Sequence, residues 1–114
     1  MTYSRGDILK VDLERHDPKR SLKTRYAVVL SSNSYNDSHD HCVLAAIATN
    51  VRSDSGDGIH VIRDANAIGL GNESSMVTPW LWTVGWHRVI EKVGQMTPYE
   101  FDQVMERLRE VVPL

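Results

Sequence analysis

Arg25 is the side chain in this sequence whose position most favours a chemical role. It precedes an apolar run at residues 27–30, Ala-Val-Val-Leu, and Ser and Asn residues follow that run up to position 36. An apolar run bounded by polar residues is typical of a buried strand, so Arg25 would stand at the mouth of the strand. Its guanidinium is a planar fork of donors that stays protonated, which suits it to stabilising negative charge rather than to accepting a proton. On the residues alone, the alternative is an ordinary surface ion pair.

A dense set of potential metal ligands lies within residues 37–42, Asp-Ser-His-Asp-His-Cys. The functional interpretation is a zinc or other transition-metal site, or a histidine that acts as acid or base near Arg25 and makes activity pH-dependent. We favour a polar surface connection, because His39 and His41 fall in an expected loop and a closed metal site needs ligands held at fixed geometry.

The charge of the sequence is polarised. A formal net charge of −2 argues against a nucleic-acid partner, because an anionic polymer is usually met by a basic protein. Up to Arg25, however, seven Lys and Arg residues stand against four Asp and Glu residues, whereas the remainder has six against eleven. The basic charge therefore concentrates in the segment that ends at Arg25, and a solvated loop surface is the alternative explanation.

Length and cysteine content restrict the class of protein. The 114 residues allow one core, so residues 1–114 are expected to form a single domain. The single Cys42 excludes an internal disulfide and fits a reducing compartment. We see neither a signal peptide nor an apolar run of about 20 residues, and we expect a cytoplasmic protein without membrane contact.

Short alternating segments predict strands along most of the chain. At residues 8–13, Leu9, Val11 and Leu13 share one face, which is the pattern of a half-buried strand. Further strands are expected at residues 25–31, 42–49, 59–63, 75–78, 80–84 and 89–93, with a helical turn around Tyr35 and surface loops at 14–23 and 50–58.

The end of the chain predicts a helix that packs on this sheet. Thr97 can cap it, Pro98 suits its first position, and Glu100 would complete a capping box. Its apolar residues recur every three or four positions, so one stripe faces the sheet. Small side chains on both faces of residues 42–49 indicate a strand crowded by neighbours. The fold class is therefore mainly β, a small β-barrel with helical decoration.

In order and spacing, the residues resemble the MazF/PemK toxins of bacterial type II toxin–antitoxin systems. The matching positions cover nearly the whole chain, and their ordered set carries the resemblance more than any one motif. They are Arg5-Gly6-Asp7-Ile8, Val11-Asp12, Lys23-Thr24-Arg25-Tyr26-Ala27-Val28-Val29-Leu30-Ser31, residues 33–36, Ile47-Ala48-Thr49, Gly69-Leu70, Ser75, Thr83-Val84, Arg88, Val93-Gly94 and the terminal helix.

The resemblance implies an SH3-like barrel, a symmetric homodimer and sequence-selective cleavage of single-stranded RNA without metal or other cofactor. A cognate antitoxin would hold this activity in check. Arg25 and Thr49 match the catalytic positions of the family, Arg25 to stabilise negative charge on the phosphoryl group and Thr49 to donate from its hydroxyl or to orient the ribose 2′-hydroxyl. Arg20 and Lys23 are candidates for positioning phosphates.

The segment Pro79-Trp80-Leu81-Trp82-Thr83 departs from the family, in which many members have Asp-Gln-Ile-Arg-Thr. On a strand, Trp80 and Trp82 point the same way. They could bury in the core or against a second subunit, which we favour, or stack on RNA bases. The cleavage sequence therefore cannot be transferred from relatives.

Two other functions remain open on the sequence. One is a gyrase-binding toxin like the CcdB family, which shares the barrel, although its recognition depends on a tryptophan near the C-terminus and this chain has no tryptophan after Trp86. The other is a catalytically silent binding module of the same fold.

Overall fold

The structure is a computed structural model that describes residues 2–13, 23–49, 57–63, 65, 68–71 and 75–113. For Leu13, Lys23 and Thr49 it describes the backbone alone. The elements in chain order are β1 (Asp7–Leu13), β2 (Lys23–Val29), α1 (Asn33–Ser38), β3 (His41–Thr49), β4 (His60–Val61), β5 (Ser75–Gly85), the 3₁₀ turn η1 (Trp86–Arg88), β6 (Val89–Gln95) and α2 (Pro98–Leu108).

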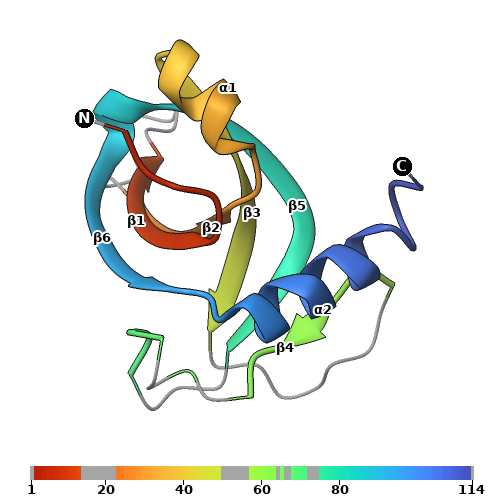
Figure 1. The fold of residues 1–114 in the computed structure, drawn as a ribbon. Helices are drawn as coiled ribbons and strands as arrows, with labels where there is room; N and C mark the ends of the chain where they lie inside the picture. Colours follow the sequence, from red (N-terminus) through yellow and green to blue (C-terminus); the bar gives the residue numbers. More distant parts are fainter. Residues whose placement is uncertain are drawn as a thin grey trace.

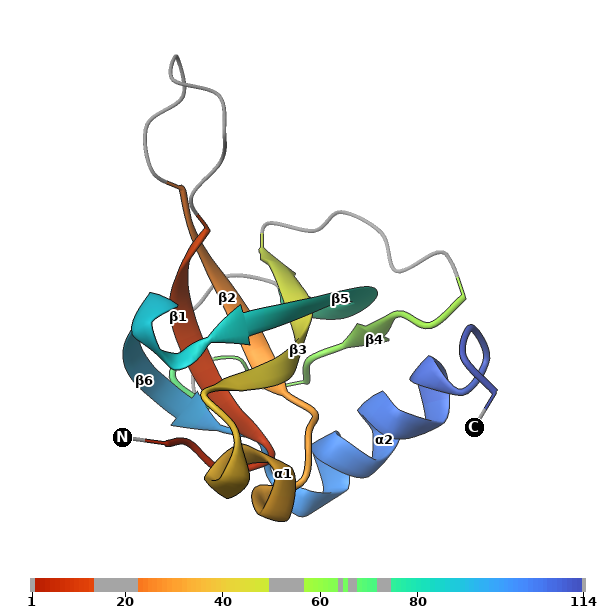
Figure 2. The ribbon, with the colours of Figure 1, turned by 90° about the horizontal axis from the view of Figure 1, so that it is seen from above.

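Six strands form one antiparallel sheet in the order β4-β5-β3-β2-β1-β6. The sheet curls strongly, so that β6 and β5 lie on opposite sides of β1 and β2 (Figure 1). Helix α1 covers one end of the curled sheet, and α2 runs beside β4 (Figure 2). This is the predicted mainly β fold with a C-terminal helix. No helix in the described part of the chain is long and apolar enough to cross a membrane.

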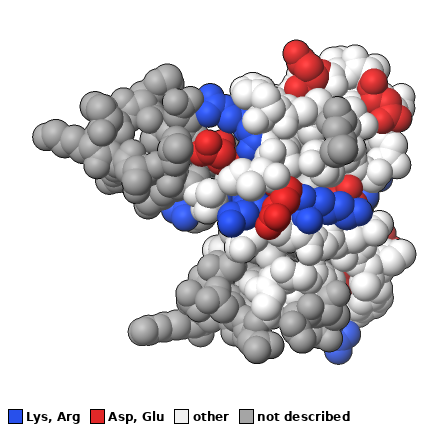
Figure 3. Space-filling model, turned by 90° about the vertical axis from the view of Figure 1, so that its left-hand side faces the viewer, with Lys and Arg blue, Asp and Glu red and all other residues white. Residues whose placement is uncertain are grey.

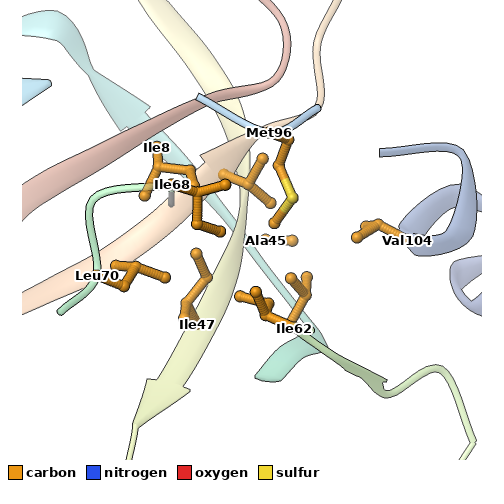
Figure 4. Packing of buried hydrophobic residues seen from close by; sticks show 10 residues of the cluster. Ile8, Ala45, Ile47, Ile62, Ile68, Leu70, Met96 and Val104 are labelled. Atoms are coloured by element: carbon orange, nitrogen blue, oxygen red, sulfur yellow. The ribbon is translucent and has the colours of Figure 1, made fainter. Parts of the chain in front are cut away.

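Both faces of the sheet are buried. One face packs against α2 and Ile68, with Ala45 and Ile47 of β3 in the cluster and Val104 of α2 to their right in the view (Figure 4). The other face carries a second apolar cluster, to which β3 contributes Leu44. Strand β3 lies between β5 and β2 and is covered on both faces, where the larger Leu44 and Ile47 are buried beside the small Ala45.

Strand β5 is longer than predicted, because it continues through Pro79 where the sequence indicated two separate strands. The pairing with β3 shifts register between Ala45 and Ile47, which leaves a bulge at Pro79. The missing N–H of proline is therefore not needed for the ladder. Within the bulge the Thr78 hydroxyl donates to the Ala46 carbonyl (3.0 Å) and accepts from the Trp80 N–H (3.3 Å). Strand β4, in contrast, covers only His60–Val61.

The predicted cap of α2 is confirmed in its first half. The Thr97 side chain accepts from the Glu100 N–H at 3.1 Å, and Pro98 begins the helix. The carboxylate of Glu100 does not complete a capping box. It is buried and instead binds the His60 ring and accepts from the Arg63 N–H, so that it joins the start of α2 to β4.

Candidate active site

Arg25 lies near the start of β2, directly opposite Val11 of β1. Residues paired across an antiparallel ladder point to the same face, so Arg25 lies on the face that carries Val11 and Ala27. Its side chain is half-buried. Among the described residues, none forms a hydrogen bond or an ion pair with it. The alternative of a surface ion pair is therefore not found among the described residues. Within them, the donors of the guanidinium are not used.

A hollow of about 450 Å³ opens beside Arg25. It spans from β2 across β3 to β5, and Arg25 is the one charged residue among the described residues that line it. These are Thr24, Arg25, Tyr26, Ala46, Ile47, Ala48, Trp80 and Trp82. Ala46 and Ala48 belong to the central strand, and their short side chains leave the space that larger residues would fill.

Trp80 and Trp82 reach this hollow from β5, but their burial differs. Trp80 is 67% exposed, so the favoured alternative of packing in the core of this chain is wrong for that residue. Trp82 pairs with Leu44 of β3 and packs against the second cluster while it also lines the hollow. Trp86 lies apart from the site, where its indole N–H donates to the His39 carbonyl at 3.0 Å.

The other predicted site residues fall at the edge of the described structure. Thr49 is the last residue of β3, and Tyr26 pairs with Ile47, so the backbones of Thr49 and Arg25 lie at the same end of the sheet. Lys23 begins β2. The side chains of Lys23 and Thr49, like the whole of Arg20, lie outside what the structure describes.

The histidine cluster lies at the opposite end of β3 from Arg25, because His41 begins that strand. The His41 ring binds the Tyr35 hydroxyl and, through Nδ1, the carboxylate of Asp40 at 3.1 Å. This hydrogen bond is the main cause that holds the pKa of Asp40 below its ordinary value. The His39 ring stacks on Tyr35 with 4.0 Å between centroids. These rings form a polar surface connection, as favoured from the sequence, and their place rules out direct contact with Arg25.

Neither chemistry suggested for residues 37–42 is supported by the geometry. No group of three or more His, Cys, Asp and Glu side chains in the described ranges is arranged to hold a metal ion. Cys42 is fully buried, and burial raises the pKa of its thiol to about 11. A protonated, enclosed thiol is neither a good metal ligand nor a good nucleophile.

The face that carries β6 differs from the hollow in its charge (Figure 3). Acidic and basic side chains alternate there: Lys10 of β1 lies opposite Glu91 of β6, and Lys92 forms an ion pair with the buried Asp7 at 3.2 Å. Each of these charged side chains has an opposite charge nearby. Arg25 at the hollow has no such partner among the described residues.

A curled antiparallel sheet with a C-terminal helix defines a small barrel-like protein, and an arginine beside a hollow, with no described partner, is its candidate site for an anion. A family model described as PemK-like, MazF-like toxin of type II toxin–antitoxin system matches residues 4–112. The chain therefore belongs to this toxin family. No curated protein sequence matches it.

Solved structures share the fold of this chain. A MazE–MazF complex from Deinococcus radiodurans aligns with a TM-score of 0.80 at 14% identity, covering 100% of this chain and 98% of that one. A mycobacterial endoribonuclease in complex with its cognate antitoxin gives 0.78 at 16% identity, covering 98% and 96%. The Mycobacterium tuberculosis toxin MazF-mt6 gives 0.72 at 17% identity, covering 95% and 97%. At these identities the likeness concerns the fold.

Sequence reasoning identified Arg25 and the two tryptophans but missed the rest of the hollow. Tyr26, Ala46 and Ala48 line it without any feature of their own that indicates a site. The small side chains at residues 42–49 could have indicated the hollow, although from the sequence alone they indicate a crowded strand. At Ala46 and Ala48 they also leave the space of the hollow.

Proposed function

We propose that this toxin is an endoribonuclease that cleaves single-stranded RNA at selected sequences without a metal ion. The 2′-oxygen of one ribose loses its proton to water and attacks the adjacent phosphate, and the bond to the 5′-oxygen breaks while that oxygen takes up a proton from water. The products are then a 2′,3′-cyclic phosphate and a 5′-hydroxyl end. DNA lacks the nucleophile and is not cleaved.

The observation that carries this proposal is the guanidinium of Arg25 beside the hollow, without a partner among the described residues. Negative charge builds on the phosphoryl oxygens as the 2′-oxygen attacks, and a half-buried arginine stabilises it through two charge-assisted hydrogen bonds. Because the substrate supplies its own nucleophile, the role proposed for Arg25 is to hold the phosphate and stabilise its charge.

Thr49 is proposed to donate a hydrogen bond to the phosphate or to orient the 2′-hydroxyl from the end of β3. Arg20 and Lys23 are proposed to hold neighbouring phosphates. Both stand in the basic segment that ends at Arg25.

We further propose that the toxin acts in the cytoplasm as a homodimer and is neutralised by a cognate antitoxin. Membership of the PemK-like, MazF-like family supports this, as do the antitoxin complexes formed by proteins of the same fold. An antitoxin that covers the hollow would block access to Arg25.

The test is cleavage of a mixed single-stranded RNA in the presence of a chelator, with the products analysed for their end groups. The wild-type protein should leave cyclic phosphate and 5′-hydroxyl ends and spare DNA of the same sequence. Arg25→Ala should lose cleavage by a factor of about 100 or more, because one oxyanion donor is typically worth that much. Tyr99→Ala is the matched control, since Tyr99 is an exposed aromatic residue on α2.

Two results would contradict the assignment. Equal cleavage by wild type and Arg25→Ala would remove Arg25 from the mechanism. Binding of RNA without any cleavage would instead favour the catalytically silent module.

A further inference from the structure

We propose that the hollow between β2 and β5 is a subsite for one unpaired nucleotide, whose base stacks on the indole of Trp80 while its phosphate binds Arg25. The inference rests on the proposed function and extends it, because it names the residues that contact the RNA next to the cleaved bond. It concerns the segment of β5 that carries Trp80 and Trp82.

The spacing of the strands fits a single nucleotide. Strands β2 and β5 are the two neighbours of β3, so their backbones lie about 10 Å apart, which is two strand spacings. Arg25 stands on one wall, Trp80 and Trp82 on the other, and Ala46 and Ala48 form the floor. A volume of about 450 Å³ lies in the range of small-molecule sites, and it admits one flipped-out nucleotide but not a duplex.

Trp80 is placed to stack rather than to stabilise the fold. With 67% of its side chain exposed, the indole gains little from burial within this chain. Its backbone is nevertheless fixed, because the Trp80 N–H donates to the Thr78 hydroxyl, which itself donates to the Ala46 carbonyl. An aromatic surface on a rigid backbone is the common platform for single-stranded nucleic acid.

The charge of the hollow selects the kind of occupant. An apolar surface from a second copy of the chain would cover Arg25 without offering an anion, and burying a guanidinium without a counter-charge is costly. A nucleotide matches both walls at once, with a phosphate for the guanidinium and an aromatic base for the indole. An acidic peptide would match Arg25 but would leave the exposed indole without a stacking partner.

The hollow discriminates weakly between bases. The described residues that line it include no amide and no carboxylate side chain, the groups that read base edges by paired hydrogen bonds. Stacking tolerates any base, since every base has a π-face. This subsite should therefore require an unpaired base while accepting several identities.

The test crosses two protein variants with two substrates. Trp80→Ala and the control Tyr99→Ala are each assayed on a single-stranded RNA and on the same RNA with abasic residues introduced one position at a time near the cleaved bond. Trp80→Ala should raise KM about tenfold on intact RNA with kcat nearly unchanged, and Trp80→Phe should restore much of the loss. At one of the positions tested, the abasic residue should raise KM for the wild type. At that position the KM values of the wild type and Trp80→Ala should then be equal.

The binding arm separates this inference from the proposed function. Affinity is measured with a 2′-O-methyl strand, which cannot be cleaved, and tighter binding to wild type than to Trp80→Ala supports the subsite even if no cleavage is found. If the wild type cleaves RNA while Trp80→Ala shows the same KM and affinity, the subsite is wrong and the nuclease stands. Conversion of a dimer to a monomer by Trp80→Ala, with unchanged affinity for the strand, would assign Trp80 to the contact between copies and overturn the inference.

Discussion

Arg25 is held in place by neighbours that do not neutralise it. Val11 and Ala27 on the same face of the sheet are fully buried and fix the strand on which Arg25 stands. No described residue forms a hydrogen bond or an ion pair with its guanidinium. This separation of position from pairing is typical of a residue that serves a ligand rather than the fold.

Replacement of Arg25 by lysine should therefore reduce activity without reducing stability. Lysine keeps the charge but loses the planar fork that binds two phosphoryl oxygens, so kcat should fall about 100-fold while the midpoint of thermal unfolding changes by about 2 °C or less. Single-turnover cleavage and thermal unfolding of the same samples measure both quantities. Full activity of Arg25→Lys would show that charge alone suffices.

Cys42 should make the stability of the fold depend on pH, and this effect does not involve the candidate active site. Burial raises the pKa of its thiol from 9.0 to about 11. The folded state thus holds the proton more tightly than the unfolded state, so this contribution to stability is complete below pH 9 and is lost as the pH rises towards 11. The free energy of unfolding should fall more between about pH 8 and pH 10 in wild type than in Cys42→Ala, by urea unfolding. Equal losses would mean that Cys42 is already open to solvent.

At the scale of elements, the sequence predicted best where the signal is local. The cap of α2 at Thr97 and the apolar core of β2 were recovered because each depends on adjacent residues. Strand β5 was divided at Pro79 because the bulge that accommodates it depends on the register with β3. The same limit applies to Glu100, whose carboxylate binds His60 from a distant strand instead of closing the cap.

The site was predictable to a similar extent. Arg25 could be identified because its charge borders an apolar run, whereas the floor of the hollow required the pairing of β3 with both neighbours. Ala46 is an ordinary strand residue until that pairing places it between Arg25 and Trp82.

Gly94 of β6 allows a close backbone contact that no other residue would permit. A Cβ at this position would lie 1.7 Å from the Ile68 carbonyl oxygen, and one at Gly69 would lie 1.9 Å from the Val93 carbonyl oxygen. Gly94→Ala should therefore lower the free energy of unfolding by about 4 kcal/mol or more, because backbone must move on both sides.

Gly71→Ala is the matched control for this contact. Gly71 has a φ of +75°, but a Cβ added there would meet nothing within 4 Å, so the cost is only the conformational strain of about 1–2 kcal/mol. Urea unfolding of both variants measures the difference. Equal losses of unfolding free energy in the two variants would show that the contact of residue 94 with residue 68 costs no more than conformational strain.

The whole molecule is not basic in its overall charge. Its net charge is −2, and on the face that carries β6 acidic and basic side chains alternate (Figure 3). Under the proposed function, affinity for RNA should therefore come more from stacking and less from counterion release than in a basic nucleic-acid-binding protein. This agrees with a site that combines one described cation with two indoles.

The dependence of RNA affinity on salt should consequently be shallow. Each phosphate contact to a single strand contributes about −0.7 to the slope of log K against log salt concentration, so Arg25 with Lys23 and Arg20 predicts a slope of about −2. Arg25→Ala should reduce its magnitude by about 0.7, whereas Trp80→Ala should lower affinity at every salt concentration and leave the slope unchanged, because stacking releases no counterions. Titration of a short 2′-O-methyl strand from 50 to 200 mM salt, roughly the range over which such slopes are resolved, measures both. A slope steeper than about −4 would contradict this division, since the strand would then have to contact twice as many cations as the site provides.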